Sequence, residues 1–166
     1  MAQIEFQRKI EQIDSTRLVY VDETGFDQYF CRTHCWAKRG EIIEGSFSGK
    51  RFARTNFIGG LCNGKIVGGK FYKHSTNSKF FEEWFEQILL KNIPRKSIIV
   101  MDNATFHRKK ILRKLARKTK CQVIFLPPYS PNLNPIEKWW ANVKRYLSAY
   151  CFESLVPTIC AYFKIE

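Results

Sequence analysis

No apolar run in this sequence approaches the roughly 18 consecutive residues that a helix needs to cross a bilayer. The first ten residues, Met-Ala-Gln-Ile-Glu-Phe-Gln-Arg-Lys-Ile, contain no apolar core of the kind that a signal peptide requires. A Gly-x-Ser-x-Gly motif and a Cys/His pair with an orienting acid are both absent, so a covalent nucleophile of either type finds no support. Internal repeats and low-complexity tracts are missing as well. We therefore expect a cytoplasmic protein that makes no membrane contact.

Acidic residues are scarce: 15 Asp and Glu stand against 28 Lys and Arg, which gives a formal net charge of +13. Because phosphate contacts by Lys and Arg drive nucleic-acid binding, this excess indicates a polyanionic partner. The simpler alternative is a basic protein that its charge keeps soluble. Hydrophobic residues make up 45% of the 166 residues and aromatic residues 15%, which favours one folded domain with a substantial core.

The cysteines form neither a disulfide pattern nor a complete zinc site. Six of them stand at positions 31, 35, 62, 121, 151 and 160. Cys31, His34 and Cys35 have the spacing of half a zinc site, but no second Cys/His pair completes it. We interpret the cysteines as the reduced thiols of a cytosolic protein.

Three carboxylates occur in unusual contexts. Asp22 follows the apolar run 18–21, Asp102 follows the apolar run 98–101, and Glu137 lies just inside a helical pattern, with 34 residues between it and Asp102. Burying an acid at the end of a strand without a partner costs roughly several kcal/mol. Two such acids and a third on a helix therefore suggest one site for divalent cations, since carboxylates hold the paired metal ions that assist phosphodiester cleavage.

Four motifs surround these acids. They are Val-Tyr-Val-Asp-Glu-Thr-Gly-Phe (19–26), Trp-Ala-Lys-Arg-Gly-Glu (36–41), Val-Met-Asp-Asn-Ala-Thr-Phe-His (100–107) and Leu-Pro-Pro-Tyr-Ser-Pro-Asn-Leu-Asn-Pro-Ile-Glu (126–137). With the order and the spacing of the acids, they resemble the catalytic domain of mariner-type DDE transposases, a group that includes many bacterial insertion sequences. The resemblance covers roughly residues 17–148.

The resemblance implies an RNase H-like fold and the cut-and-paste reaction of a DNA transposase. In that reaction a metal-activated water cleaves DNA at the transposon ends, and the freed 3′-hydroxyl attacks target DNA. Asp22, Asp102 and Glu137 would be the catalytic residues and would hold two Mg²⁺ or Mn²⁺ ions. The implied partners are DNA, as transposon ends and as target, and a second copy of the chain in a homodimer, at the nucleoid of a bacterial cell.

Each acid also has a purely structural interpretation. Asp22 suits a turn before the following Thr-Gly, and Asp102 suits an Asx turn or a helix cap. Glu137 sits at the third position of a helix that Asn134 would cap and Pro135 would begin, so a capping box alone would explain it. The shared context of the two aspartates and the loop resemblance favour the metal site.

The apolar periodicities predict a mixed α/β architecture. In chain order they indicate a strand, a hairpin around Asn63-Gly64, a helix, a strand, a helix, a strand and a helix, which fits an RNase H-like mixed five-stranded sheet flanked by helices. The strands are expected at 17–22, 56–61, 65–72, 96–101 and 122–126, with a short strand near Cys35-Trp36, and the helices at 76–90, 107–117, 135–148 and 153–163. The last long helix should bury Ile136, Trp139, Trp140, Val143 and Leu147.

Basic residues cluster beside the acids. The stretch 108–120 carries eight cations and no acid, where a solvated helix face usually mixes both signs. We expect phosphate contacts that position DNA without reading its sequence. His107 either contacts a phosphate, tunes the site or caps the following helix. The predicted DNA-binding residues are His107, Arg108, Lys109, Arg113, Lys114, Arg117, Lys138, Lys144 and Arg145.

The chain divides into an N-terminal helix or linker (1–16), an RNase H-like DDE catalytic domain (17–150) and a C-terminal helix that packs on the same domain (151–166). Members of the family carry helix-turn-helix domains that read the transposon ends. Three sources of that recognition stay open for this chain: a helix-turn-helix polypeptide encoded upstream, a frameshifted fusion, or none at all. Two other functions remain open: a different RNase H-like nuclease, such as a resolvase, and a transposase remnant that only binds DNA or a partner subunit.

Overall fold

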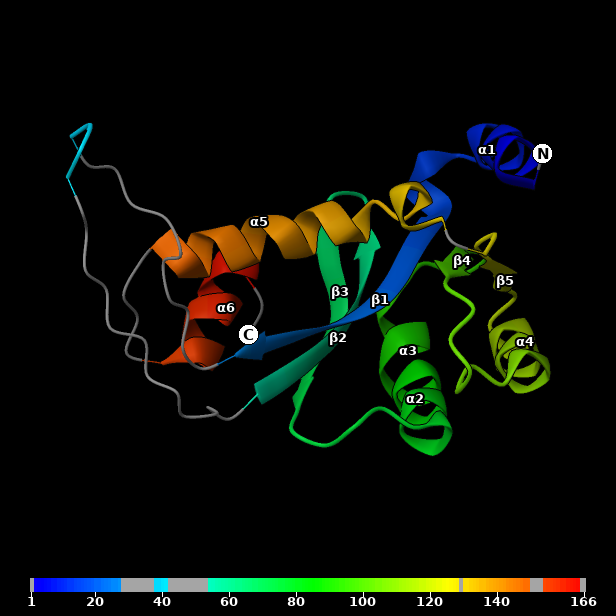
Figure 1. Ribbon diagram of the computed structural model, residues 1–166. Coiled ribbons are helices and arrows are strands. Elements are labelled where there is room, and N and C mark those ends of the chain that lie inside the picture. Colours follow the sequence, from blue (N-terminus) through cyan, green and yellow to red (C-terminus); the bar gives the residue numbers. More distant parts are fainter. Residues whose placement is uncertain (1, 28–37, 42–53, 129, 150–153, 165–166) are drawn as a thin grey trace.

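The computed structural model describes residues 2–27, 38–41, 54–128, 130–149 and 154–164 (Figure 1). The predicted short strand near Cys35-Trp36 and the half zinc site at Cys31, His34 and Cys35 lie outside these residues. None of the helices in the described ranges has both the length and the apolar character that crossing a membrane demands.

A mixed five-stranded sheet forms the centre of the fold, as predicted. Its order is β3-β2-β1-β4-β5, in which β1 pairs antiparallel with β2 and parallel with β4. The β2–β3 pair is antiparallel and the β4–β5 pair is parallel. The strands are β1 (Leu18–Asp27), β2 (Arg54–Cys62), β3 (Lys65–Tyr72), β4 (Ile98–Met101) and β5 (Gln122–Phe125).

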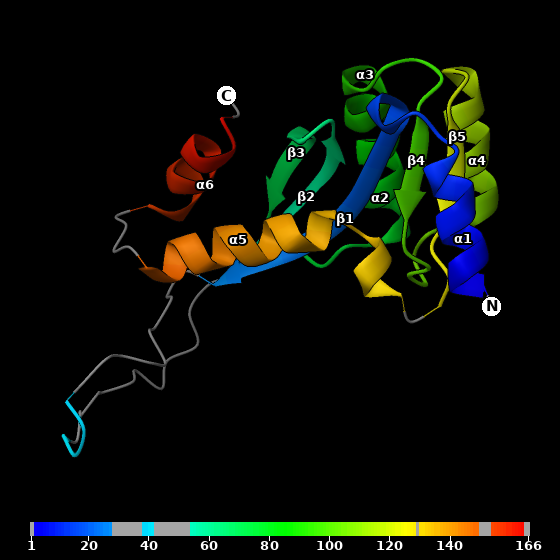
Figure 2. The same cartoon turned by 90° about the horizontal axis from the view of Figure 1, so that it is seen from above.

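Helices cover both faces of the sheet (Figures 1 and 2). The helices α2, α3 and α4, with the π-helical turn η2, pack on one face, whereas α5 and α6 cover β1, β2 and β3 on the other and α1 covers β4 and β5. They are α1 (Ala2–Glu11), η1 (Ser15–Arg17), α2 (Ser78–Trp84), η2 (Phe85–Leu89), α3 (Leu90–Asn92), α4 (Lys109–Lys118), η3 (Pro131–Leu133), α5 (Ile136–Ala149) and α6 (Leu155–Phe163).

The hairpin between β2 and β3 turns as its sequence predicts. Asn63 and Gly64 have φ angles of 52° and 71°, the left-handed pair that a two-residue turn of this kind requires. The helix predicted at 76–90 is also present, capped by the side chain of Asn77, which accepts from the Phe80 N–H at 2.9 Å. The π-helical turn within it was not predicted, because apolar spacing does not distinguish a single wide turn from an α-helix.

The first strand is longer than predicted, and this changes the position of Asp22. The prediction ended this strand at residue 22, but β1 continues to Asp27, because its antiparallel pairing with β2 extends as far as Asp27 opposite Arg54. The parallel pairing with β4 stops earlier, at Tyr20 opposite Val100. Asp22 therefore lies within a strand, two residues beyond Tyr20, the last residue of β1 that pairs with β4.

Two glycines of β3 and its turn provide a test of how η2 packs on the sheet. Gly64 and Gly68 both have left-handed φ angles, of 71° and 61°, so a side chain at either position costs about 1–2 kcal/mol. A Cβ at Gly64 would meet nothing within 4 Å, whereas one at Gly68 would lie 3.2 Å from the Leu89 Cα. Gly68→Ala should therefore lose roughly 1–3 kcal/mol more free energy of unfolding than Gly64→Ala. Urea unfolding of both variants measures the difference. Equal losses of unfolding free energy would mean that η2 shifts to accommodate the new methyl group at no cost.

Candidate active site

Side-chain alternation along β1 separates two neighbouring acids onto opposite faces of the sheet. Val19 and Val21 belong to the core under α2 and α4, and Glu23 continues that series. Leu18 and Tyr20 face the side of α1 and α5, and Asp22 continues this second series. Asp22 therefore meets α5, whereas Glu23 meets the turn before α4.

Asp22 is held against α5 in a setting that disfavours its charge. The Trp140 indole N–H donates to Asp22 Oδ2 at 3.0 Å, and Trp140 itself is buried on the core face of α5. Burial is the largest of the causes that raise the pKa of Asp22 to about 8, and the nearby carboxylates of Glu137 and Glu23 act in the same direction. The buried side of the site therefore carries an acid that makes no ion pair with any of the described residues.

Asp102 follows directly after β4, as predicted, and is fixed by its own turn. Its Oδ1 accepts from the Ala104 backbone N–H at 3.0 Å and lies 3.1 Å from His107 Nδ1. The hydrogen bond from His107 holds the pKa of Asp102 below its usual value, although partial burial opposes this effect. About half of the Asp102 side chain is exposed (51%), so the other carboxylate oxygen remains open to a ligand.

Glu137 begins α5 without making the capping box that would explain it structurally. Its backbone N–H donates to the Asn134 carbonyl at 3.1 Å. The Asn134 side-chain oxygen is buried and has no hydrogen-bond partner within the part of the chain that the structure describes. No side-chain hydrogen bond holds the Glu137 carboxylate there either. The Glu137 side chain is therefore free to serve the cavity beside it.

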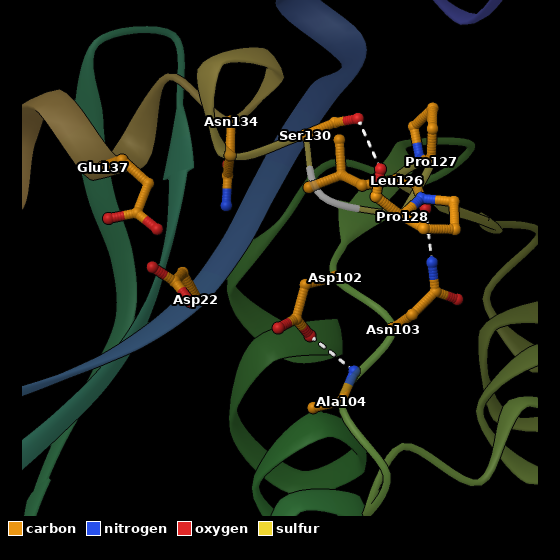
Figure 3. A pocket seen from close by; sticks show the side chains of 10 residues that line it. All are labelled: Asp22, Asp102, Asn103, Ala104, Leu126, Pro127, Pro128, Ser130, Asn134 and Glu137. Atoms are coloured by element: carbon orange, nitrogen blue, oxygen red, sulfur yellow. Dashed lines mark hydrogen bonds between the residues drawn. The ribbon is translucent and has the colours of Figure 1, made fainter. Parts of the chain in front are cut away.

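One pocket brings the three predicted acids together (Figure 3). Its volume is about 450 Å³, and the carboxylates of Asp22 and Glu137 point toward each other across it, with Asp102 on the adjacent wall. The backbone after β5 supplies the opposite wall. The lining residues are Asp22, Asp102, Asn103, Ala104, Leu126, Pro127, Pro128, Ser130, Asn134 and Glu137.

The donor set of this pocket fits hard divalent cations. Its charged groups are carboxylates, and carboxylate oxygens are the ligands that Mg²⁺ prefers, with water completing the shell. Within the described ranges, no group of three or more His, Cys, Asp or Glu side chains converges on a point where it would hold a single ion. The acids thus fit ions that each take one or two protein carboxylates, and a cation would relieve the repulsion between Asp22 and Glu137.

The structure adds an ion-pair chain that the sequence did not suggest. The buried ring of His107 lies between Asp102 and Glu23, with Nε2 3.7 Å from Glu23 Oε1, and it packs against Phe81 at a centroid distance of 4.2 Å. Burial alone would lower the pKa of His107, but the contacts with Asp102 and Glu23 overcome it and raise the pKa to about 9. Of the roles predicted for His107, this position fits the tuning of Asp102. Glu23 directly follows Asp22, yet only the register of β1 reveals its partner.

The predicted basic residues divide into paired and unpaired groups. Arg108 donates twice to Glu82, at 2.6 and 2.5 Å, so the run 108–120 is not wholly uncompensated as the sequence suggested. Lys118 likewise contacts Glu86 at 2.6 Å. Lys109 donates to Asn103, whose amide in turn donates to the Leu126 carbonyl. These three cations therefore hold α4 and the pocket wall in place.

The remaining predicted residues lie on exposed surfaces. Lys138, Lys144 and Arg145 are exposed on α5. Lys144 lines a second pocket of about 560 Å³ on the other side of Asp22 and Glu137, together with Arg54 and Tyr72. Lys114 is exposed on α4, and Arg113 and Arg117 line a separate pocket at its end.

Comparison with known proteins gives a family match over most of the chain. A family model described as DDE superfamily endonuclease matches residues 17–155. None of the curated proteins matches the chain by sequence.

Solved structures match the fold. The Mos1 transposase paired-end complex with left transposon end superimposes with a TM-score of 0.76 at 17% identity over 99% of this chain and 53% of that chain. The Mos1 mariner paired end complex with Mn gives 0.76 at 18% identity, over 98% and 52%. The catalytic domain of Mos1 mariner transposase gives 0.69 at 16% identity, over 99% and 78%. The chain thus spans about half of the Mos1 chain in the complexes, and its fold is RNase H-like as predicted.

The two raised pKa values predict how pH changes stability when divalent cations are removed. Asp22 binds a proton more tightly in the folded chain (pKa about 8) than in the unfolded chain (3.8), so stability falls as pH rises between these values. His107 contributes stability that is present below its unfolded pKa of 6.5 and is lost as pH rises through about 9. In EDTA, the free energy of unfolding should therefore decrease from pH 6.5 to pH 8 through both groups.

Asp22→Asn separates the two contributions. The amide oxygen can still accept from Trp140, but the buried charge is gone, so this variant should be roughly 1–3 kcal/mol more stable than the wild type at pH 8 in EDTA. Asp27→Asn, at an exposed position of the same strand, is the matched control and should change little. Urea unfolding across the pH series measures all three proteins. An Asp22→Asn protein that is no more stable than the wild type at pH 8 would contradict the unfavourable charge.

Proposed function

We propose that this chain, which belongs to the DDE superfamily endonucleases, is a DNA transposase catalytic domain. It would cleave one DNA strand and join it to another. The reaction class is polynucleotidyl transfer: hydrolysis of a phosphodiester, then attack by the freed 3′-hydroxyl on target DNA. One observation carries the proposal. Three carboxylates from β1, the end of β4 and the start of α5 line one pocket, and the most buried of them faces another acid and makes no ion pair within the described part of the chain.

In the proposed mechanism Asp22, Asp102 and Glu137 would hold two Mg²⁺ or Mn²⁺ ions. Bound divalent cations would supply charge stabilisation for the attacking and leaving oxygens of the phosphodiester and would activate the attacking water. Asp22 presents its carboxylate from the middle of a paired strand, and Asp102 from a turn closed by two hydrogen bonds. Such anchoring keeps the carboxylates in one geometry, which a metal site requires.

Neighbouring side chains orient the proposed ligands. Trp140 donates to one oxygen of Asp22, which leaves the other oxygen for an ion. His107 acts in the same way on Asp102, and Glu23 keeps the imidazole charged from its far side. These partners correspond to the outer hydrogen bonds that fix metal-bound carboxylates in other proteins. We therefore assign His107 as a positioning residue rather than a phosphate contact.

The proposed substrate is DNA, which would lie over the pocket that the three acids line. Lys144 and Arg54 line the second pocket, which shares Asp22 and Glu137 with the first, so a strand lying over these acids would meet cations on that side. Lys138 and Arg145 extend the basic surface along α5. Such contacts position the backbone without reading sequence.

Similar solved structures support the choice of substrate and metal. The Mos1 complexes contain a transposon end in one case and Mn in another, and both belong to a chain about twice as long as the matched region. For this chain we propose transposon ends and target DNA as substrates, a second copy as a partner, and a helix-turn-helix polypeptide for recognition of the ends.

Substitution of the three acids tests the proposal. Asp22→Ala, Asp102→Ala and Glu137→Ala should each reduce cleavage of end-containing duplex DNA in Mg²⁺ or Mn²⁺ by more than about 100-fold, because each removes a direct ligand and losses of outer partners already cost about 10–100-fold. Glu83→Ala changes an exposed acid on α2 and should leave cleavage unchanged. Circular dichroism should show that all four variants keep the fold.

The products distinguish the alternatives. A transposase should also yield longer molecules in which the cleaved 3′-end is joined to target DNA. Cleavage without joined products would indicate a resolvase-type nuclease. If none of the proteins cleaves DNA but DNA binding is intact, the chain is a remnant that acts only by binding. Full cleavage activity of any one acid variant would exclude that residue from the proposed site.

A further inference from the structure

We propose that a second site, at the C-terminal end of α4, binds phosphates of a duplex DNA backbone. It is a pocket of about 430 Å³ that contains three cations and no acid. The lining residues are Arg113, Arg117, Lys120, Cys121, Gln122 and Val123. This inference rests on the proposed function only in taking DNA as the polyanion, and it concerns a surface that the acids do not reach.

The cations of this site differ from their neighbours on the same helix. Arg108 and Lys118 are neutralised by Glu82 and Glu86 on the adjoining helical segment. Arg113 and Arg117, four residues apart and hence on one face of α4, have no ion-pair partner among the described residues. The Arg113 guanidinium instead lies 5.5 Å from the centroid of the Phe125 ring, which supports it over β5 without cancelling its charge.

Lys120 stands where the backbone favours glycine. The Lys120 N–H donates to the Arg117 carbonyl at 3.0 Å, and the Cys121 N–H donates to the Ala116 carbonyl at 2.9 Å. This is the hydrogen-bond pair of a Schellman helix end, whose left-handed residue is usually Gly. Lys120 occupies that position with a φ of 62°. A side chain there costs stability, and this one lines the same pocket as Arg113 and Arg117.

The site is remote from the catalytic pocket along the strands. Gln122 pairs with Ile98 at the amino ends of β5 and β4, whereas Leu126 and Asp102, which line the catalytic pocket, follow the carboxyl ends of the same strands. In Figure 1, α4 lies at the β5 edge of the molecule, away from α5 and α6. A phosphate bound by Lys120 is therefore a different phosphate from the one that undergoes reaction, and the two sites together would hold an extended stretch of DNA.

Two structural explanations account for only part of the pattern. Cations near a helix C-terminus interact favourably with its dipole, and charges at a sheet edge prevent pairing with other strands. Either effect would be satisfied by Lys118 or Lys114 on the regular helix. Neither effect explains why three cations, one of them at a left-handed position, border one hollow.

Two lysine-to-glycine variants test the site. Lys120→Gly relieves the backbone and removes the charge, and Lys164→Gly does the same at a left-handed helix end on α6, far from α4. Binding of a labelled duplex of random sequence is measured by anisotropy, in EDTA, over a series of KCl concentrations. Lys120→Gly should flatten the slope of log affinity against log salt by about 0.9, the value for one phosphate contact. Lys164→Gly should leave the slope unchanged, and neither variant should melt below the wild type.

A second variant extends the test to the arginines. Arg113→Gln combined with Arg117→Gln should flatten the slope by up to about 1.8. Equal slopes for Lys120→Gly and Lys164→Gly would overturn the site, because net charge would then explain the binding. Aggregation of Lys120→Gly with an unchanged slope would also overturn it, because the lysine would then serve to protect the sheet edge. Titration with inorganic phosphate is a further arm: phosphate binding that Lys120→Gly abolishes, with the DNA slope unchanged, would overturn the assignment to DNA. Because EDTA prevents catalysis, a wild type that never cleaves DNA would still give these slopes, so the two proposals fail separately.

Discussion

The buried carboxylate of Asp22, facing Glu137 and held by Trp140, is the constraint on which the site depends. Such a carboxylate costs stability, so it persists only because the surrounding structure fixes it. Antiparallel pairing with β2 holds Asp22 opposite Gly59, and the buried stripe of α5 places Trp140 over the strand. A cation between Asp22 and Glu137 would turn their repulsion into binding energy. The arrangement of these two carboxylates therefore favours a ligand of positive charge.

The two faces of β1 divide the work of the site between neighbouring residues. Asp22 projects toward α5 and the cavity, whereas Glu23 projects under α4 and pairs with His107. His107 also contacts Asp102. Glu23 in β1 and Asp102 after β4 are therefore coupled through a buried histidine rather than through solvent. This coupling depends on the strict alternation of a paired strand. A loop in the same place would supply the carboxylates without fixing their relative positions.

Local signals in the sequence were sufficient for most of the fold, and long-range pairing accounts for the rest. The Asn63-Gly64 turn and the stripe from Ile136 to Leu147 were predictable because their causes lie within a few residues. The extension of β1 was not, since it follows from pairing with β2 across a gap of 26 residues between Asp27 and Arg54. The site shows the same division between local and long-range causes. Local motifs identified the three acids that line the pocket. The partners Trp140 and Glu23, by contrast, emerged only from register and packing.

Two pockets contain side chains in unfavourable settings, and the two pockets have opposite charges. Judged on the described residues, the pocket of the three acids combines an acid of raised pKa with a buried, unpaired Asn134 oxygen, and the α4 pocket combines a left-handed Lys120 with two arginines that make no ion pair. Natural proteins accept such losses mainly where function requires them. An anionic pocket attracts metal ions, and a cationic pocket attracts phosphates. A nucleic-acid enzyme needs both, held apart so that the acids do not neutralise the cations. The sheet provides that separation, since the acids line a pocket beside the carboxyl ends of β4 and β5, whereas Lys120 and Gln122 of the α4 pocket lie at the amino end of β5.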